Sequence, residues 1–301
     1  MNSQSAAIPE SFGAGRIPTT DASATKPFYW SIRRELWEYR SIYLAPLAVS
    51  AVMLIGFLGA TIARAMGTSD IAQRRHILEE PYIVATGMVM ITMFIVSVFY
   101  CLDTLQAERR DRSILFWKSL PVSDRTTVLA KVSIPFVILP AAAIVITYTT
   151  NWMMLLLSSA VMLASGLGVG PMWRQLFMLQ ISLLYHLITV HLLWYAPVYT
   201  WLLLISAWAR RAALLWATLP LLAIGFFEKI VFRTDHFGLW LKYRFSGPES
   251  YDMAAPGFAI HPMMHLSLAR FLSTPGLWIG FGLAAIFIFA TIRLRRYREP
   301  M

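Results

Sequence analysis

Two long stretches without charged side chains constrain the fold of this chain more than any other feature. No Asp, Glu, Lys or Arg occurs from Val132 to Trp173, and none occurs from Gln175 to Trp208. A helix needs about 20 apolar residues to cross a bilayer. Hydrophobic residues make up 57% of the chain and charged residues 14%, against about 45–50% and about 25% in soluble domains. The sequence therefore predicts an all-α integral membrane protein.

Six membrane-spanning helices are expected, and seven are the main alternative. The expected spans cover residues 43–64, 82–102, 132–164, 175–208, 212–232 and 275–293. The fourth is long, and Pro197 could kink it. The alternative folds residues 132–173 into a hairpin that turns at TYTTNW. We favour six, because TYTTNW contains no Gly or Pro, whereas GLGVGP (166–171) contains three glycines and a proline.

The basic residues predict an orientation. With six spans and both termini in the cytoplasm, about two thirds of the Lys and Arg residues face inward, as the positive-inside rule requires. The seven-span alternative gives the same division, so charge does not separate the two. Both place residues 103–131 in the cytoplasm. The net charge of +10 is thus explained by orientation, and nucleic-acid binding is not expected.

The parts outside the spans have distinct compositions. Residues 1–27 are rich in Ser, Thr, Ala, Pro and Gly and are expected to form a disordered cytoplasmic tail. Residues 28–41 carry aromatic and basic side chains and are expected to form an interfacial helix; the cytoplasmic end of the first span is the alternative. The rest of the 28–296 membrane domain includes an external connection, residues 233–274, and residues 297–301 form a cytoplasmic tail.

The segment ERRDRSILFWKSLPVSDR (108–125) contains eight charged residues among eighteen. As a helix beginning near Thr104, it would be short and separately bounded, with charge all round its axis and then the apolar turn ILFW. Proline at 121 would end it, and Ser123 is the expected N-cap of the next helix, with Asp124 in its first turn. An apolar turn beside dense charge suits a docking surface. Alternatively, the basic residues anchor the span ends while ILFW lies among the headgroups.

This segment resembles the signature of type-2 ABC exporter permeases. The resemblance consists of Glu108-Arg109-Arg110, the apolar turn, LPVS (120–123), and Lys131 leading a long apolar helix. The order of spans also matches over most of residues 28–296, although only residues 103–131 are specific. Many members have Gly-Thr where this chain has Arg112-Ser113. In this family the segment is the coupling helix, which sits in a cleft of a separate ATP-binding subunit.

The resemblance implies partners. The chain would be half of a homodimer or heterodimer in a bacterial cytoplasmic (inner) membrane, paired with two copies of an ATP-binding subunit that drives export. It contains no G-x-x-x-x-G-K-[ST] loop, so no cofactor is expected on this chain, and ATP and Mg would be held by the partner. The expected partner-binding residues in the coupling segment (103–125) are Glu108, Arg109, Arg110, Asp111, Arg112, Ile114, Leu115, Phe116, Trp117, Leu120 and Pro121.

Several other side chains have weaker interpretations. His261 and His265 flank Met263 and Met264, a set of soft ligands that could bind copper, but no cysteine or carboxylate completes the set, and an interfacial helix is favoured. His186 and His191 are five apart and are expected on different faces of a span, in packing or hydrogen bonds. Finally, the G-x-x-x-G spacing at residues 276–280 is a weak signal of close helix packing.

Three other functions fit the sequence less well than export does. No span has a charged residue near its centre, which argues against a proton-coupled transporter. An intramembrane enzyme would have to use His186, His191 or Asn151, but no nucleophile, base and orienting residue occur at a recognisable spacing. No catalytic residue is therefore expected. A permease-like subunit that docks the same ATPase in order to sense or organise, without transport, is the closest alternative.

Overall fold

The computed structural model describes residues 25–111, 122–164, 166, 168–246 and 268–297. All regular elements within these residues are helices, as expected. They are α1 (Thr25–Glu38), α2 (Ser41–Gly56), η1 (Phe57–Thr61), α3 (Ile62–Gly67), α4 (Ile71–Arg110), α6 (Asp124–Ser133), η2 (Ile134–Ile138), α7 (Leu139–Ala164), α8 (Gly170–His186), η3 (Leu187–Trp194), α9 (Ala196–Trp208), α10 (Ala213–Phe227), η4 (Glu228–Phe232), α11 (His236–Ser246), α12 (Leu268–Leu272) and α13 (Pro275–Tyr297). The four segments labelled η are π-helical turns continuous with their neighbours.

Six helices in the described part of the chain are long and apolar enough to cross a membrane, which confirms the number expected. They are Ser41–Gly67, Ala72–Arg110, Asp124–Ala164, Met172–Trp194, Ala213–Phe232 and Pro275–Tyr297. The third runs without interruption through TYTTNW, so the hairpin of the seven-span alternative does not form. The chain turns after it at Gly166, whose φ of 70° favours glycine.

The expected fourth span, residues 175–208, is not one helix. It divides into α8 with η3 and the shorter α9, and the interruption falls at Tyr195, whose φ and ψ are −82° and 4°. Pro197 lies just inside α9, where its missing N–H costs nothing because first-turn donors have no partner within the helix. The proline therefore starts a new helix here and does not kink an existing one.

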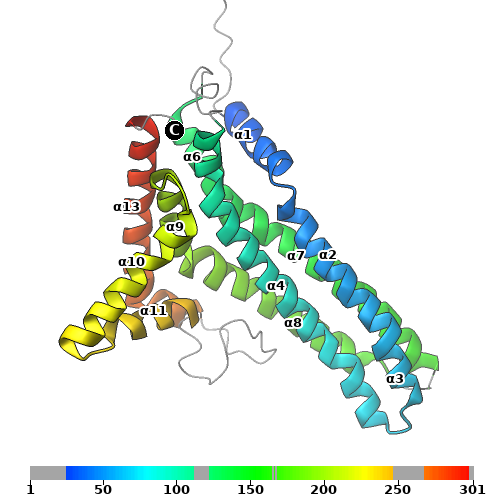
Figure 1. Ribbon diagram of the computed structural model, residues 1–301. Coiled ribbons are helices and arrows are strands. Elements are labelled where there is room, and N and C mark those ends of the chain that lie inside the picture. Colours follow the sequence, from blue (N-terminus) through cyan, green and yellow to red (C-terminus); the bar gives the residue numbers. More distant parts are fainter. Residues whose placement is uncertain (1–24, 112–121, 165, 167, 247–267, 298–301) are drawn as a thin grey trace, which may run out of the picture.

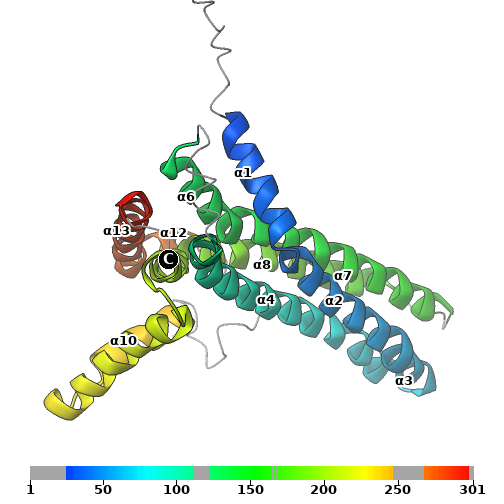
Figure 2. The same ribbon diagram turned by 45° about the horizontal axis from the view of Figure 1, so that its top comes forward.

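The helices form two groups that diverge from one end of the molecule (Figure 1). In one group α2, α4, α7 and α8 run side by side, as a second view also shows (Figure 2). In the other, α9 packs against α13 and also against α4. The helix α10 points away from both groups, and only 6% of its most apolar window is buried within the chain.

Polar side chains within the first group join its helices. Ser50 on α2 bonds Thr150 on α7, and Asn151 donates to Thr86 on α4 at 3.1 Å. Farther along, the Tyr82 hydroxyl lies 2.9 Å from the Ser158 hydroxyl. Interhelical hydrogen bonds of this kind average about 0.6 kcal/mol in a membrane. Asn151, a candidate residue of the intramembrane-enzyme alternative, thus takes part in a contact between helices.

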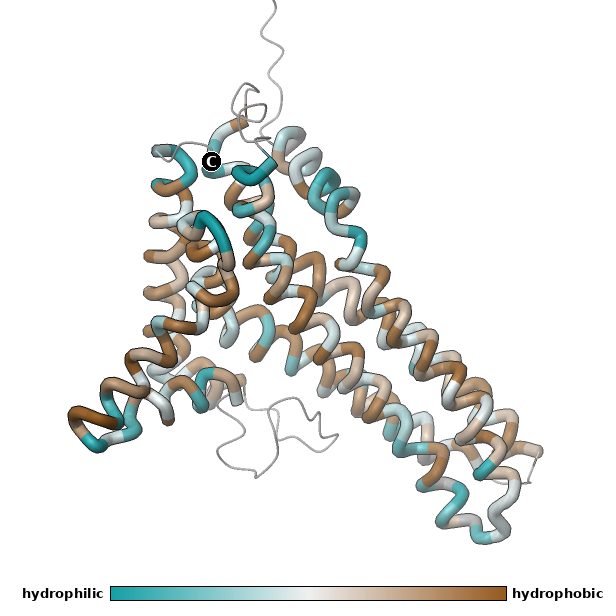
Figure 3. Tube along the Cα trace, in the orientation of Figure 1, coloured by the Kyte–Doolittle hydropathy of each residue, from teal (hydrophilic) through white to brown (hydrophobic). Residues whose placement is uncertain are grey.

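Polar residues gather at the ends of the helices and apolar residues cover the lengths between them (Figure 3). One polar end contains α1, α6 and the last turns of α13. The helix α1 occupies residues 25–38, where an interfacial helix over 28–41 was expected, and it packs against α6. The tails 1–24 and 298–301 lie outside the described residues.

The beginning of the coupling segment differs from the expectation. No separate helix begins near Thr104, because α4 continues without a break to Arg110. The N-cap prediction is confirmed: the Ser123 hydroxyl accepts from the backbone N–H of Thr126 at 3.1 Å, and Asp124 lies in the first turn of α6. Residues 112–121, between these two helices, lie outside the described residues.

Candidate coupling site

Four helices converge at the polar end of the molecule, and each contributes charge to a buried cluster. The helix α1 provides Arg34 and Glu35, α4 provides Glu108, α6 provides Asp124 and Lys131, and α13 provides Arg295. We refer to these six residues as the charge cluster. Four of them are almost fully buried: Glu35 and Lys131 are 1% exposed, Glu108 is 3% exposed and Arg295 is 6% exposed.

Glu35 and Lys131 form the innermost pair of the cluster. The Lys131 Nζ lies 2.8 Å from Glu35 Oε1 and 2.7 Å from the Thr104 hydroxyl. The other Glu35 oxygen accepts from the hydroxyls of Tyr100 at 2.9 Å and Thr104 at 3.0 Å. These acceptors and donors come from α1, α4 and α6, so the pair holds three helices at one point.

Glu108 links the pair to α13. Its Oε1 lies 2.7 Å from Arg34 Nη2 and 3.1 Å from Lys131 Nζ, and its Oε2 lies 3.0 Å from Arg295 Nη2. Arg295 also contacts Asp124 through its other terminal nitrogen, at 2.6 Å. Arg295 therefore bridges the end of α4 and the first turn of α6, on either side of residues 112–121.

Spacing along α4 explains why one helix serves the whole cluster. Tyr100, Thr104 and Glu108 follow each other at intervals of four residues, and side chains at this spacing share a face of a helix. The face begins in the apolar part of α4 and ends at the charged end. Consequently the two hydroxyls lie deeper than the carboxylate and satisfy the partners that reach in from α1 and α6.

Opposite charges offset the cost of burial. Burial alone would raise the pKa of the Glu35 carboxyl, but the charges of Lys131 and Arg34 outweigh it, and its pKa is lowered. Breaking a buried pair by removing one partner costs about 3–5 kcal/mol, because a charge is left uncompensated. The cluster is therefore expected to keep the four helix ends together as one unit.

Arg109 fastens α4 to the second group of helices. Its Nη2 donates to the backbone carbonyls of Ser206 at 2.8 Å and Ala209 at 2.7 Å. These carbonyls belong to the end of α9, where the last four carbonyls of a helix have no partner within the helix. The arginine is 4% exposed, so its guanidinium caps α9 from inside the protein.

The predicted partner-binding residues fall into three sets. Glu108 and Arg109 turn into the chain, where direct contact with a partner was expected, and they join its own helices. Arg110 and Asp111 are exposed at the end of α4. The remaining predicted residues lie outside the described part of the chain: Arg112, Ile114, Leu115, Phe116, Trp117, Leu120 and Pro121.

Sequence reasoning missed the roles of Glu35 and Arg295. Glu35 lies within the expected interfacial helix 28–41, where no role was predicted for it, and Arg295 lies in a run of basic residues near the C-terminus. Arg295 differs from Arg293 and Arg296 in being buried, which a run of similar residues does not reveal. One signal was present: Lys131 stands alone at the start of an uncharged block, and a lone buried cation needs a carboxylate partner.

The two histidines in the fourth span are closer than predicted. His186 and His191 were expected on different faces, but their ring centroids are 5.6 Å apart. The reason is the π-helical segment η3, in which residues five apart follow each other as residues four apart do in an α-helix. His191 Nδ1 lies 3.3 Å from the Tyr199 hydroxyl, and Phe94 and Tyr195 also pack against its ring. Packing was the interpretation favoured.

Metal binding has no support in the described residues, among which no group of three or more His, Cys, Asp and Glu side chains could hold a metal ion. The weak candidates His261, Met263, Met264 and His265 lie outside them. The single cysteine, Cys101, is buried.

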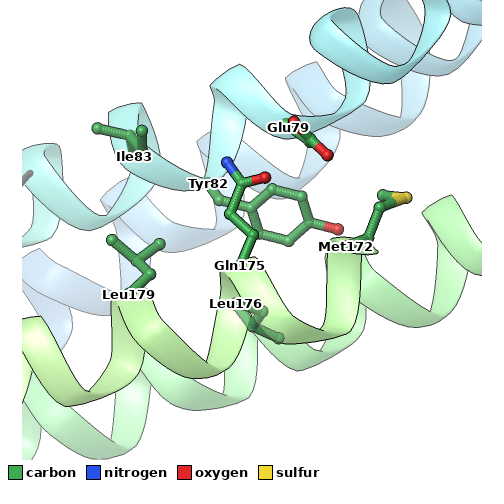
Figure 4. Close-up of a pocket in the computed structure, with 7 residues that line it drawn as sticks. All are labelled: Glu79, Tyr82, Ile83, Met172, Gln175, Leu176 and Leu179. Carbon is green, nitrogen blue, oxygen red and sulfur yellow. The ribbon is translucent and has the colours of Figure 1, made fainter. Parts of the chain in front are cut away.

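A small pocket lies between α4 and α8, near the other end of α4 (Figure 4). Tyr82, Met172 and Leu176 line it together with Gln175 and Glu79. With the amide oriented to donate, its nitrogen lies 2.9 Å and 3.1 Å from the two Glu79 oxygens. The Gln175 amide and the Glu79 carboxylate therefore join α8 to α4.

Comparisons with protein-family models, with curated proteins and with solved structures found no match to this chain.

Proposed function

We propose that this chain is the permease subunit of an ATP-driven exporter of the type-2 ABC class. The observation that supports it best is the position of the charge cluster, which lies where α4 and α6 enter and leave residues 112–121. A segment that receives force from a partner needs rigid connections at both ends. Arg295 contacts both of these ends, through Glu108 on α4 and Asp124 on α6.

The cluster suggests how movement would pass into the membrane. Glu108 and Lys131 join the two helices that flank the segment, and Arg34 and Arg295 attach α1 and α13 to them. A displacement of residues 112–121 would thus move four helix ends together. Arg109 extends the same connection to α9, so both diverging groups of helices would respond.

In this proposal the partner supplies the energy. The chain has no phosphate-binding loop of the G-x-x-x-x-G-K-[ST] kind, and ATP and Mg would be bound by two copies of a separate ATP-binding subunit. Exposed Arg110 and Asp111, together with ILFW (114–117), would form the docking surface. A second permease chain would complete the path, in a bacterial inner membrane with both termini in the cytoplasm.

The docking surface can be tested with one pair of tryptophan variants. Trp117→Ala should reduce both the amount of ATP-binding subunit that co-purifies and the substrate-stimulated ATPase rate, because aromatic side chains at the centre of an interface contribute about 2 kcal/mol or more. Trp240→Ala is the control, since Trp240 lies on α11 at the other end of the molecule and is exposed. Equal co-purification and ATPase rates in the two variants would refute the assignment.

Glu108→Ala tests the cluster separately from the surface. Because Glu108 contacts the chain's own helices, we expect this variant to insert and to bind the ATPase, but to transport less substrate per ATP. Transport into inverted vesicles also separates the closest alternative: an ATPase that docks normally in the absence of any transport would identify a sensory or organising subunit.

A further inference from the structure

Arg244 is buried at the end of the molecule opposite the charge cluster, on the short helix α11 (Figure 1). It is 5% exposed. Its guanidinium carbon lies 4.5 Å from the centroid of the Trp194 ring, and Nη1 donates to the Gly276 carbonyl at 3.1 Å. No carboxylate forms an ion pair with it anywhere in residues 25–111, 122–164, 166, 168–246 or 268–297.

The other buried basic side chains are better compensated. Lys131 and Arg295 each contact two carboxylates, and Arg109 donates two hydrogen bonds to carbonyls that cap a helix. Arg244 has one carbonyl and one aromatic face. Its Nε is buried and has no hydrogen-bond partner among the described residues. Burial lowers the pKa of Arg244 to about 10, as expected for a cation that no carboxylate of the described residues neutralises.

Gly280 of α13 leaves the slot that holds this side chain, and Gly276 accepts its hydrogen bond. A Cβ added at Gly280 would lie 1.8 Å from Arg244 Nη2, a distance that requires the guanidinium to move. A Cβ at Gly276 would meet its nearest neighbour, the Trp194 ring, at 3.4 Å, which is ordinary contact. The G-x-x-x-G spacing therefore gives the arginine access to the bare backbone of α13, where helix-to-helix packing was expected.

The slot is fixed in place from a second side. The Trp194 Nε1 donates to the Arg244 carbonyl at 2.8 Å, and the Tyr195 hydroxyl donates to the Phe245 carbonyl at 2.8 Å. These two bonds tie the last turn of α11 to the break between η3 and α9. Because its backbone is held, the Arg244 side chain starts from a preorganised position.

We propose that Arg244 anchors a binding site for a phosphate group at the outer end of the protein. A guanidinium carries donors in a planar fork that matches phosphate oxygens. The eleven residues of α11 include Lys242 as a second, exposed cation and contain no acid. Tryptophan and tyrosine side chains beside the slot are typical of the depth at which lipid headgroups lie. The source of the phosphate is an anionic lipid headgroup or a phosphate-bearing solute. The site is independent of the proposed export function.

The test uses the full-length chain in nanodiscs. Wild-type chain should retain phosphatidylglycerol over phosphatidylcholine in native mass spectrometry, and Arg244→Gln should weaken that retention about tenfold or more, as expected for loss of a hydrogen-bonded charge. Lys242→Gln removes the neighbouring exposed charge as the matched control and should weaken it much less. Equal retention in wild-type chain and Arg244→Gln, with no effect of phosphate esters on either, would overturn the proposal.

A second pair of variants leaves the arginine in the sequence. Gly280→Ala should expel the guanidinium from the slot and lower phosphatidylglycerol retention. Gly276→Ala should lower it less, because a Cβ there would make an ordinary contact with the Trp194 ring, at 3.4 Å, and would not displace the guanidinium. Competition with glycerol phosphate identifies the source. If the soluble ester displaces the lipid from wild-type chain but has no effect on Arg244→Gln, the site binds a solute. If the lipid is retained despite the ester, the site binds a lipid headgroup. If Gly280→Ala and Gly276→Ala both bind as wild type does, the slot has no role.

Discussion

Removal of the Lys131 amine is the sharpest perturbation of the charge cluster. Lys131→Met keeps the length of the side chain and deletes a cation that is 1% exposed and contacts Glu35, Glu108 and Thr104. Loss of one partner of a buried pair costs about 3–5 kcal/mol. Both carboxylates keep arginine partners, Arg34 and Arg295, so we expect the lower end of this range, about 3 kcal/mol of unfolding free energy.

Lys229→Met is the matched control for this prediction. Lys229 lies 3.6 Å from Asp235, and both side chains are more than half exposed, so the same substitution there should cost about 0–1 kcal/mol. Equilibrium unfolding in mixed detergent micelles measures both variants. The double variant Glu35→Gln with Lys131→Met should be more stable than the sum of the two single losses predicts, by about 1–3 kcal/mol.

If Lys131→Met and Lys229→Met lose the same stability, or if the losses of Glu35→Gln and Lys131→Met add without coupling, the cluster does not hold the helix ends together. A loss of stability in Lys131→Met that is smaller than about 3 kcal/mol, together with strong coupling to Glu35→Gln, would support the contacts. It would indicate that Arg34 and Arg295 compensate for the missing amine.

Two further predictions concern the same end of the molecule. Arg109→Met should destabilise the chain by about 2 kcal/mol, since it removes charged hydrogen bonds to the end of α9. Arg110→Met, at the exposed neighbouring position, should change the unfolding free energy by less than about 0.5 kcal/mol. Equal losses in the two variants would contradict the capping role of Arg109. Because the pKa of Glu35 is lowered on folding, its ionised form stabilises the protein above the ordinary pKa of about 4.3. That contribution disappears as the pH falls through the lowered pKa of Glu35 in the folded protein. The unfolding free energy of Glu35→Gln should therefore depend less on pH below about 4.3 than that of the wild-type chain. Identical pH profiles of the two proteins would contradict this prediction.

Hydropathy made much of this fold predictable. The number of spans follows from uncharged blocks of sufficient length, and a polar boundary at Ser123 and Asp124 was enough to place the start of α6. Both features are local, and a bilayer enforces them because backbone polar groups must be satisfied within each helix. Other features of the fold depend on contacts between distant segments.

The break at Tyr195 and the meeting of His186 with His191 were not predictable in the same way. A π-helical segment changes which residues share a face, and no composition or spacing rule in LITVHLLW announces one. Packing against Phe94 and against the end of α11 accompanies this conformation. Periodicity at 3.6 residues per turn therefore gave the wrong relation between the two rings.

The candidate site shows the same limit. In ERRDR the charges look equivalent, yet Glu108 and Arg109 are buried whereas Arg110 and Asp111 are exposed. Glu108 and Arg109 are buried because α1, α6, α9 and α13 pack against that side of α4. The residues that contact them come from distant parts of the chain, and Arg295 is 187 positions from Glu108. The sequence predicts that these charges lie outside the membrane spans, but their division into internal contacts and surface required the packed structure.

The most direct test of the proposed function is to purify the tagged chain from its native membrane in mild detergent and identify the proteins that accompany it. We predict an ATP-binding subunit at two copies for each pair of permease chains, lost when residues 114–117 are replaced by polar residues. Repeated purification of the intact, folded chain without any ATP-binding protein would contradict the central claim.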